Sequence, residues 1–277
     1  MKNFKAKKSL GQNFLEYIEI IDKIVLASGA NAQSTILEIG PGKGALTEAL
    51  LKTGARVVAV EKDDRAIEFL NEKFTTAITA GKFVLIHDDI LEFDIEKCNA
   101  ERNTVLPCGE YIIAANIPYY ITGEFLRKFL ETSCSPKKMV VMLQKEVAER
   151  IIGGSDGDKE SILSISVKAY GKPEYVMTVP AEFFDPKPKV DSALLSIDSI
   201  SKDFFTKNTI SAISEEKFFK TVKTGFAHKR KVVIKNLEQL IPKETLDSVW
   251  NTRSLSPKIR AENLTLDDWR VIASNCD

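Results

Sequence analysis

Residues 35–44, TILEIGPGKG, combine an apolar run with a turn that contains three glycines. The run 35–39 predicts a buried strand that ends at Gly40, and a helical pattern follows over residues 44–52. Strand, glycine turn and helix in this order are typical of an open parallel sheet, where ligands bind beyond the carboxyl ends of the strands. Glycine lets a ligand approach the backbone closely. The stretch therefore predicts an α/β fold with a ligand site at this turn.

The same alternation continues along the chain. Apolar runs at 56–60, 83–86, 111–115 and 139–143 predict four more parallel strands. Helical patterns occupy 64–74, 123–131 and 146–152, whereas 92–110 predicts an irregular link. Runs at 175–179 and 193–197 flank a proline-rich loop and predict an antiparallel edge. The fold class that we expect is α/β, with an open, doubly wound, Rossmann-like sheet.

Strand patterns end near residue 200. Short helices are predicted at 215–226, 232–240, 243–250 and 267–274. The 277 residues suffice for about two domains at ~150 residues each. We therefore predict a catalytic domain of residues 1–198 and a small all-helical domain of residues 199–277.

Composition excludes several classes of protein. Hydrophobic residues make up 44% and charged residues 28% of the chain, which are globular values. No apolar run approaches the ~20 residues of a membrane span. No metal site is expected, because the cysteines and histidines are too far apart in sequence to form metal-ligand motifs. The chain has two histidines and four cysteines, which are Cys98, Cys108, Cys134 and Cys276. We expect the four cysteines to be unpaired, as in a reducing cytoplasm.

Carboxylates follow two of the predicted strands. Glu61 ends the second strand, 21 residues after Gly40, and Asp89 follows the third. An acid at such a position can hydrogen-bond a ribose diol. Solvated charges at strand ends are the alternative interpretation, but these features lie in register at one sheet edge. The pattern favours a cofactor that contains a nucleoside.

The fourth strand ends in Asn116-Ile117-Pro118-Tyr119. A proline turn with a buried tyrosine is one interpretation, and an amine-methylating site is the other. The Asn116 amide and the Pro118 carbonyl could accept both N–H bonds of an adenine amine, and Tyr119 could stack on the base. This favours S-adenosylmethionine (SAM) over NAD, because the turn also has GxGxG spacing and not the GxGxxG of dinucleotide binders.

Seven motifs occur in an order that resembles one enzyme family, the small-subunit ribosomal RNA adenine dimethyltransferases (KsgA type). The likeness runs from about residue 8 to 272. The motifs are SLGQNFL (9–15), EIGPGKGALTEAL (38–50), VVAVEKDD (57–64), ANIPYY (115–120), VPAEFFDPKPKVDSALL (179–195), GFAHKRKVVIKNL (225–237) and IRAENLTLDDW (259–269).

The resemblance implies a SAM-dependent enzyme that dimethylates two adjacent adenosines near the 3′ end of 16S rRNA and takes part in small-subunit biogenesis. It implies a set of cofactor-binding residues, which are Asn13, Leu15, Gly40, Glu61, Asp89 and Asn116. It implies catalytic roles for Asn116, Pro118 and Tyr119, with Phe184 as a second aromatic wall opposite Tyr119. An ordinary core phenylalanine is the alternative interpretation of Phe184.

Basic residues indicate where RNA would bind. Residues 217–235 hold seven Lys or Arg and no acid, and residues 1–15 hold four Lys and no acid. We expect Lys7, Lys8, Lys229, Arg230 and Lys231 to contact phosphates, although a solvated helix face is the common alternative for such a run. The expected partner is small-subunit rRNA or an immature subunit, and the expected state is a cytoplasmic monomer.

Three other functions remain as alternatives. Antibiotic-resistance methyltransferases of large-subunit rRNA share the catalytic motifs, but the 226–237 and 260–264 runs resemble the small-subunit enzymes. An assembly factor that binds immature subunits, with incidental methylation, is the second. A nicotinamide dehydrogenase is the third, and the glycine spacing speaks against it.

Overall fold

The protein divides into two compact units. The computed structural model describes residues 5–7, 11–15, 17–101, 106–153, 159–206, 213–228 and 230–276. The first unit comprises Met1–Ala148 and Lys172–Ile200, and the second comprises Glu149–Gly171 and Ser201–Asp277. The boundary predicted after residue 198 lies two residues before the division at Ile200, and the second unit also takes in Glu149–Gly171.

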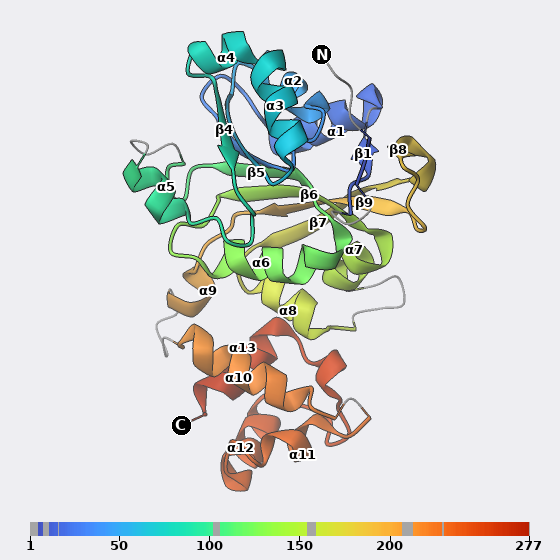
Figure 1. Ribbon diagram of the computed structural model, residues 1–277. Coiled ribbons are helices and arrows are strands. Elements are labelled where there is room, and N and C mark those ends of the chain that lie inside the picture. The colour runs from blue at the N-terminus through green and yellow to red at the C-terminus, as the bar shows by residue number, and fades with distance from the viewer. Residues whose placement is uncertain are drawn as a thin grey trace. The chain divides into compact units, whose positions relative to one another are not determined.

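A seven-stranded sheet in the order β4-β3-β2-β5-β6-β9-β7 forms the centre of the first unit (Figure 1). The five strands from β4 to β6 are parallel, whereas β9 pairs antiparallel with both β6 and β7. This confirms the predicted doubly wound sheet and its antiparallel edge. The strands are β2 (Thr35–Ile39), β3 (Arg56–Glu61), β4 (Phe83–His87), β5 (Ile112–Asn116), β6 (Lys138–Gln144), β7 (Lys172–Val179) and β9 (Ser192–Asp198).

Helices cover both faces of this sheet, with α1, α2 and α3 over one face and α6 over the other (Figure 1). Because both faces are covered, the central strands are apolar runs, and Val57, Val58 and Ala59 of β3 have no exposed surface. A short pair, β1 (Phe14–Leu15) and β8 (Phe184–Asp185), lies outside the main sheet. The helices are α1 (Ile18–Ser28), α2 (Ala45–Lys52), α3 (Asp64–Lys73), α4 (Thr75–Thr79), α5 (Ile95–Glu101), η2 (Tyr119–Ile121), α6 (Thr122–Glu131), α7 (Lys145–Ile152) and η3 (Ala181–Phe183).

The link predicted to be irregular at 92–110 contains a helix, α5, so that prediction was wrong. The Asp94 side chain accepts a hydrogen bond from the backbone N–H of Lys97 at 2.9 Å, which satisfies one of the N–H groups that a helix start leaves unpaired. Downstream, the Asn99 side chain accepts a bond from Leu106 N–H at 2.9 Å and donates one to the Leu106 carbonyl at 2.7 Å. Side-chain hydrogen bonds therefore support α5, which has no strong apolar period in its sequence.

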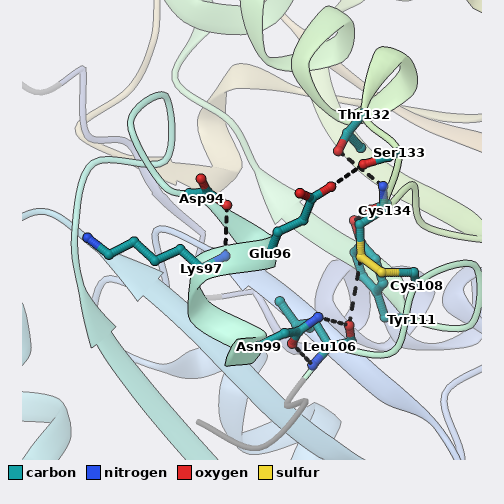
Figure 2. Close-up of a disulfide and its surroundings, with 10 residues drawn as sticks. All are labelled: Asp94, Glu96, Lys97, Asn99, Leu106, Cys108, Tyr111, Thr132, Ser133 and Cys134. Atoms are coloured by element: carbon teal, nitrogen blue, oxygen red, sulfur yellow. Dashed lines mark hydrogen bonds between the residues drawn. A yellow bond between two sulfur atoms is a disulfide. The ribbon is translucent and has the colours of Figure 1, made fainter. Parts of the chain in front are cut away.

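Cys108 and Cys134 form a disulfide, which corrects the expectation that all four cysteines are unpaired (Figure 2). Cys108 precedes β5 and Cys134 precedes β6, and these strands are neighbours in the sheet, so their Cα atoms lie 4.4 Å apart. The Tyr111 hydroxyl also donates to the Cys134 carbonyl at 2.8 Å. The disulfide could not be predicted from the 26-residue separation in sequence, because the order of the strands in the sheet brings the two cysteines together.

The second unit is helical. Phe218, Val233 and Trp269 have no exposed surface and form part of its core, and Trp269 stacks on Phe226 with ring centroids 5.6 Å apart. Among the described residues, no helix is long and apolar enough to cross a membrane. The helices are α8 (Ile162–Lys168), α9 (Asp203–Thr206), α10 (Glu215–Gly225), α11 (Val233–Leu237), α12 (Lys243–Thr252), η4 (Ala261–Asn263) and α13 (Leu266–Ser274).

Candidate active site

A pocket opens at the carboxyl edge of the sheet, beyond β2, β3 and β5, within the first unit. Its lining includes eight of the predicted site residues, which are Asn13, Leu15, Gly40, Glu61, Asp89, Asn116, Pro118 and Tyr119. Ile39, Val60, Ile90 and Leu91 add apolar surface to the same pocket. Because parallel strands end at one edge, residues from distant parts of the sequence meet there.

The glycine turn after β2 has a left-handed backbone, a conformation that glycine adopts without steric cost. Gly40 and Gly42 have φ angles of 61° and 56°. A Cβ atom on Gly40 would meet nothing within 4 Å, so it would project into open space at the pocket. A Cβ on Gly42 would approach the Phe14 ring to 2.9 Å. The turn therefore leaves room for a ligand on one side and packs tightly on the other.

Glu61 is fixed at the end of β3 by three backbone N–H groups. Its Oε2 accepts from Gly42 at 3.1 Å, and its Oε1 accepts from Lys62 and Asp63 at 2.9 Å each. Burial raises the pKa of the Glu61 carboxyl, and the three backbone bonds oppose that rise. The result is an oriented, largely desolvated acceptor beside the glycine turn.

Asp89 lies near Glu61 in the pocket lining and forms an ion pair with Lys62. The hydrogen bond from Lys62 holds the pKa of Asp89 below its usual range. Asp89 Oδ1 also accepts from Leu91 N–H at 3.0 Å. A charged carboxylate in this position can accept hydrogen bonds from an adenine amine.

Asn116 ends β5 with its amide fixed by a distant segment. Its Nδ2 donates to the Asn13 carbonyl at 2.9 Å. The Pro118 carbonyl accepts from Ile121 N–H at 3.1 Å, which closes the turn of η2. A carbonyl oxygen has two lone pairs, so Pro118 retains capacity for a second donor.

Tyr119 is held by Ser192 at the start of β9, with the two hydroxyl oxygens 2.7 Å apart. Burial raises the pKa of the Tyr119 phenol. Phe184 is 4% exposed and belongs to the apolar core, and it is not part of the pocket lining. The backbone of Phe184, in β8, pairs antiparallel with that of Leu15, in β1. The predicted role of Phe184 as a second aromatic wall stays a prediction.

Two residues of the site, Glu38 and Gln12, were missed from sequence. Glu38 lies buried under the pocket, where Thr47 Oγ1 donates to its Oε2 at 2.7 Å, and burial raises its pKa to about 8. Gln12 lines the pocket and donates to the buried Asp63 at 3.0 Å. Position alone could have suggested Glu38, which precedes the glycine turn. Nothing in the sequence links Gln12 to Asp63, since 51 residues separate them.

The predicted RNA contacts fall in both units. Lys7 is exposed, and its Nζ lies 3.6 Å from Asp63 Oδ1. Arg230 and Lys231 are exposed in the turn between α10 and α11, whereas Lys8 and Lys229 lie outside the described residues. Five apolar residues of this run could anchor it to the core. Phe218, Phe226 and Val233 are buried in the second unit, whereas Phe219 and Val232 are half-buried.

The residues present fit SAM. An open glycine turn suits the methionine portion, the oriented Glu61 carboxylate suits a ribose diol, and the apolar lining suits an adenine ring. Over the described part of the chain, His, Cys, Asp and Glu side chains form no cluster that could hold a metal ion.

The family model for ribosomal RNA adenine dimethylase matches residues 3–276. The chain belongs to this family. It is therefore an enzyme, a SAM-dependent methyltransferase, which confirms the cofactor predicted from the glycine turn and the two carboxylates.

Curated relatives of this dimethylase family member carry the name ribosomal RNA small subunit methyltransferase A. The one from Dehalococcoides mccartyi (strain CBDB1) is 41% identical over 271 residues, which cover 97% of this chain and 87% of the relative. The one from Fusobacterium nucleatum is 39% identical and covers 95% of each chain. The one from Bacillus pumilus is 35% identical over 98% of this chain and 91% of its own.

Solved structures share the fold. A 23S rRNA methyltransferase, ErmE, superposes with a TM-score of 0.72 at 21% identity and covers 96% of this chain and 100% of its own. A dimethyladenosine transferase from Plasmodium falciparum gives a TM-score of 0.71 at 23% identity, over 94% and 95% of the two chains. These likenesses confirm the Rossmann-like methyltransferase fold with its helical portion.

Proposed function

We propose that this dimethylase transfers methyl groups from SAM to the exocyclic amines of two adjacent adenosines near the 3′ end of 16S rRNA, and that it takes part in small-subunit biogenesis. The observation that carries the proposal is likeness along nearly the whole chain, 35–41% identity, to relatives named for the small subunit. The large-subunit enzyme ErmE is 21% identical and shares the fold. The small subunit is therefore the favoured substrate.

The site supplies what an amine methylation needs from a protein. An adenine amine is a weak nucleophile, because its lone pair is delocalised into the ring. SAM, when bound, supplies the electrophilic methyl group. Asn116 Oδ1 and the Pro118 carbonyl accept the two amine N–H bonds and stabilise the positive charge that develops at the nitrogen.

Tyr119 presents a ring to the target base, held by its hydroxyl contact with Ser192. Stacking of this kind contributes roughly 1–3 kcal/mol per base. The methylated amine is acidic and loses its proton to water, so no strong base is required in the pocket. Glu61 and Asp89 hold the ribose and adenine of the cofactor, and the segment around Asn13 and Leu15 closes over it.

RNA is held by basic side chains outside the pocket. Arg230 and Lys231 are exposed beside buried apolar anchors, and Lys7 is exposed near the pocket. With Lys8 and Lys229, these cations would contact phosphates, which fix the position of the RNA without reading its bases. We propose that the enzyme acts as a monomer in the cytoplasm, where small subunits are assembled.

The test of the proposed function is transfer of labelled methyl from SAM to purified, unmethylated small subunits, with large subunits in parallel. We expect label on small subunits only. Label confined to large subunits would favour the antibiotic-resistance activity. Absence of label from both, together with binding to immature small subunits, would favour an assembly factor.

Asn116→Ala tests the chemistry of the site. Loss of one preorganised polar contact to a transition state costs about 100- to 1,000-fold in rate, and we expect a single-turnover loss of that size. Binding of small subunits should be nearly unchanged. A variant that keeps more than about a tenth of the parental rate would contradict the role of the amide.

A further inference from the structure

Residues 11–15 line the cofactor pocket and contact several parts of the first unit. The Phe14 ring packs against Gly42 of the glycine turn, and β1 pairs with β8. Gly11 has a φ of 62°, and a Cβ there would come within 3.0 Å of the Tyr120 ring. We call residues 11–15 the N-terminal segment. It contacts both the glycine turn after β2 and the turn that follows β5.

One side chain fastens this segment to the body of the unit. Gln12 Nε2 donates to Asp63 Oδ2 at 3.0 Å, and Gln12 Oε1 accepts from the backbone N–H of Lys7 at 2.8 Å. Gln12 therefore uses both ends of its amide and has one favoured orientation.

Asp63 is suited to hold Gln12 in place. Its side chain has no exposed surface, and Arg65 donates to both of its carboxylate oxygens, at 3.0 and 2.6 Å. These bonds hold the pKa of the Asp63 carboxyl well below its usual range. Asp63 also caps α3 and donates its backbone N–H to Glu61. The anchor is thus a fixed charge on the turn that carries the ribose-binding carboxylate.

The next residue, Asn13, controls the amide of Asn116. An amide side chain has an acceptor end and a donor end, and its terminal torsion is nearly two-fold, so either end can face the pocket. The Asn13 carbonyl accepts from Asn116 Nδ2 at 2.9 Å. This leaves Oδ1 as the atom that can accept from a target amine. The reversed amide would present N–H groups to that amine.

We propose that Gln12 and Asp63 are positioning residues for methyl transfer. Their hydrogen bond holds the Asn13 carbonyl, and that carbonyl fixes the Asn116 amide with its oxygen toward the target amine. The inference rests on the proposed role of Asn116. It explains why a buried carboxylate at the end of β3 bonds to a residue 51 positions away.

A double-mutant cycle tests the inference, because residues that act through one another give non-additive effects. Single-turnover methyl transfer to small subunits is measured at saturating SAM for the parent, Gln12→Ala, Asn116→Ala and the double variant. Gln12→Ala should lower the parental rate about tenfold, as expected when a reacting group is slightly misplaced. In the Asn116→Ala background, the same change should alter the rate less than about twofold.

Two controls separate positioning from a general loss of structure. Asp198→Asn removes an ion pair with Lys138 of 2.9 Å in the same unit, outside the pocket lining, and should keep the parental rate. Gln12→Asn keeps the amide but shortens its reach, and should reproduce the loss seen with Gln12→Ala. The thermal unfolding midpoint of each variant, compared with that of the parent, tests whether the fold is kept.

The outcomes distinguish the inference from the proposed function. Equal fold losses from Gln12→Ala in both backgrounds would overturn the positioning role and leave the role of Asn116 intact. A parental rate for Asn116→Ala would overturn both.

Discussion

Removing the Glu61 carboxylate is expected to weaken SAM binding strongly. Glu61 is 6% exposed and is oriented by three backbone N–H groups at 2.9–3.1 Å, so in its proposed role it would bind the ribose without further rearrangement. A hydrogen bond to a charged group contributes roughly 1.5–3 kcal/mol, which corresponds to about a 10- to 150-fold loss of affinity. We expect Glu61→Ala to fall in that range, and Glu61→Gln, which keeps an acceptor but loses the charge, to lose less.

Isothermal titration calorimetry with SAM measures this prediction, and NAD serves as a ligand that should not bind. Glu48→Gln is a matched control, because Glu48 pairs with Lys52 and Lys73 on the surface and is not part of the pocket lining. Glu61→Ala also leaves backbone N–H groups unpaired, so its thermal unfolding is measured beside its affinity. Equal SAM affinity for Glu61→Ala and the parent would refute the assignment of Glu61 to the ribose.

Three further perturbations test other parts of the account. Replacing Lys229, Arg230 and Lys231 together by Gln should weaken small-subunit binding and leave SAM affinity unchanged. The slope of log affinity against log salt should become shallower by up to roughly 0.7 per lost phosphate contact. An unchanged slope in binding titrations would mean that these side chains are simply solvated and do not contact RNA. The pKa of the Glu38 carboxyl is raised to about 8 in the native state, against 4.5 for an ordinary carboxyl. Between these pH values the native state keeps a proton that the unfolded state has released, so the free energy of unfolding should fall as pH rises. Glu38→Gln should remove up to ~1.4 kcal/mol per pH unit of that fall in denaturant unfolding of the cofactor-free protein, and an unchanged pH slope would contradict the assignment. Cys108→Ser should lower the free energy of unfolding by about 3–4 kcal/mol in oxidising buffer and far less in reducing buffer, and equal losses in both would speak against the disulfide.

The sheet was predictable because its strands are buried on both faces. Such strands are continuous apolar runs, as at 56–60 and 111–115, and the predicted runs agree with β3 and β5 to within a residue at each end. Helix α1 was not predicted, although Ile20, Ile21 and Ile24 form its buried face and Gly29 ends it with a φ of 67°. That periodic signal was present in the sequence.

Other features of the site depend on topology. Glu61 and Asp89 could be predicted to meet, because parallel strands end at one sheet edge. The contact of Gln12 with Asp63 and that of Cys108 with Cys134 depend on strand order and on the path of the N-terminal segment. No local pattern encodes either contact. Phe184 is buried in the apolar core, and the aromatic wall that its motif suggested stays a prediction.

The central claim is methylation of two adjacent adenosines, and mapping the modified nucleosides tests it most directly. Unmethylated small subunits are incubated with the enzyme and SAM, and the 16S rRNA is digested and analysed by mass spectrometry. The account predicts N6,N6-dimethyladenosine at two neighbouring positions near the 3′ end and nowhere else in the RNA. A different methylated nucleoside, or dimethyladenosine at unrelated positions, would contradict it.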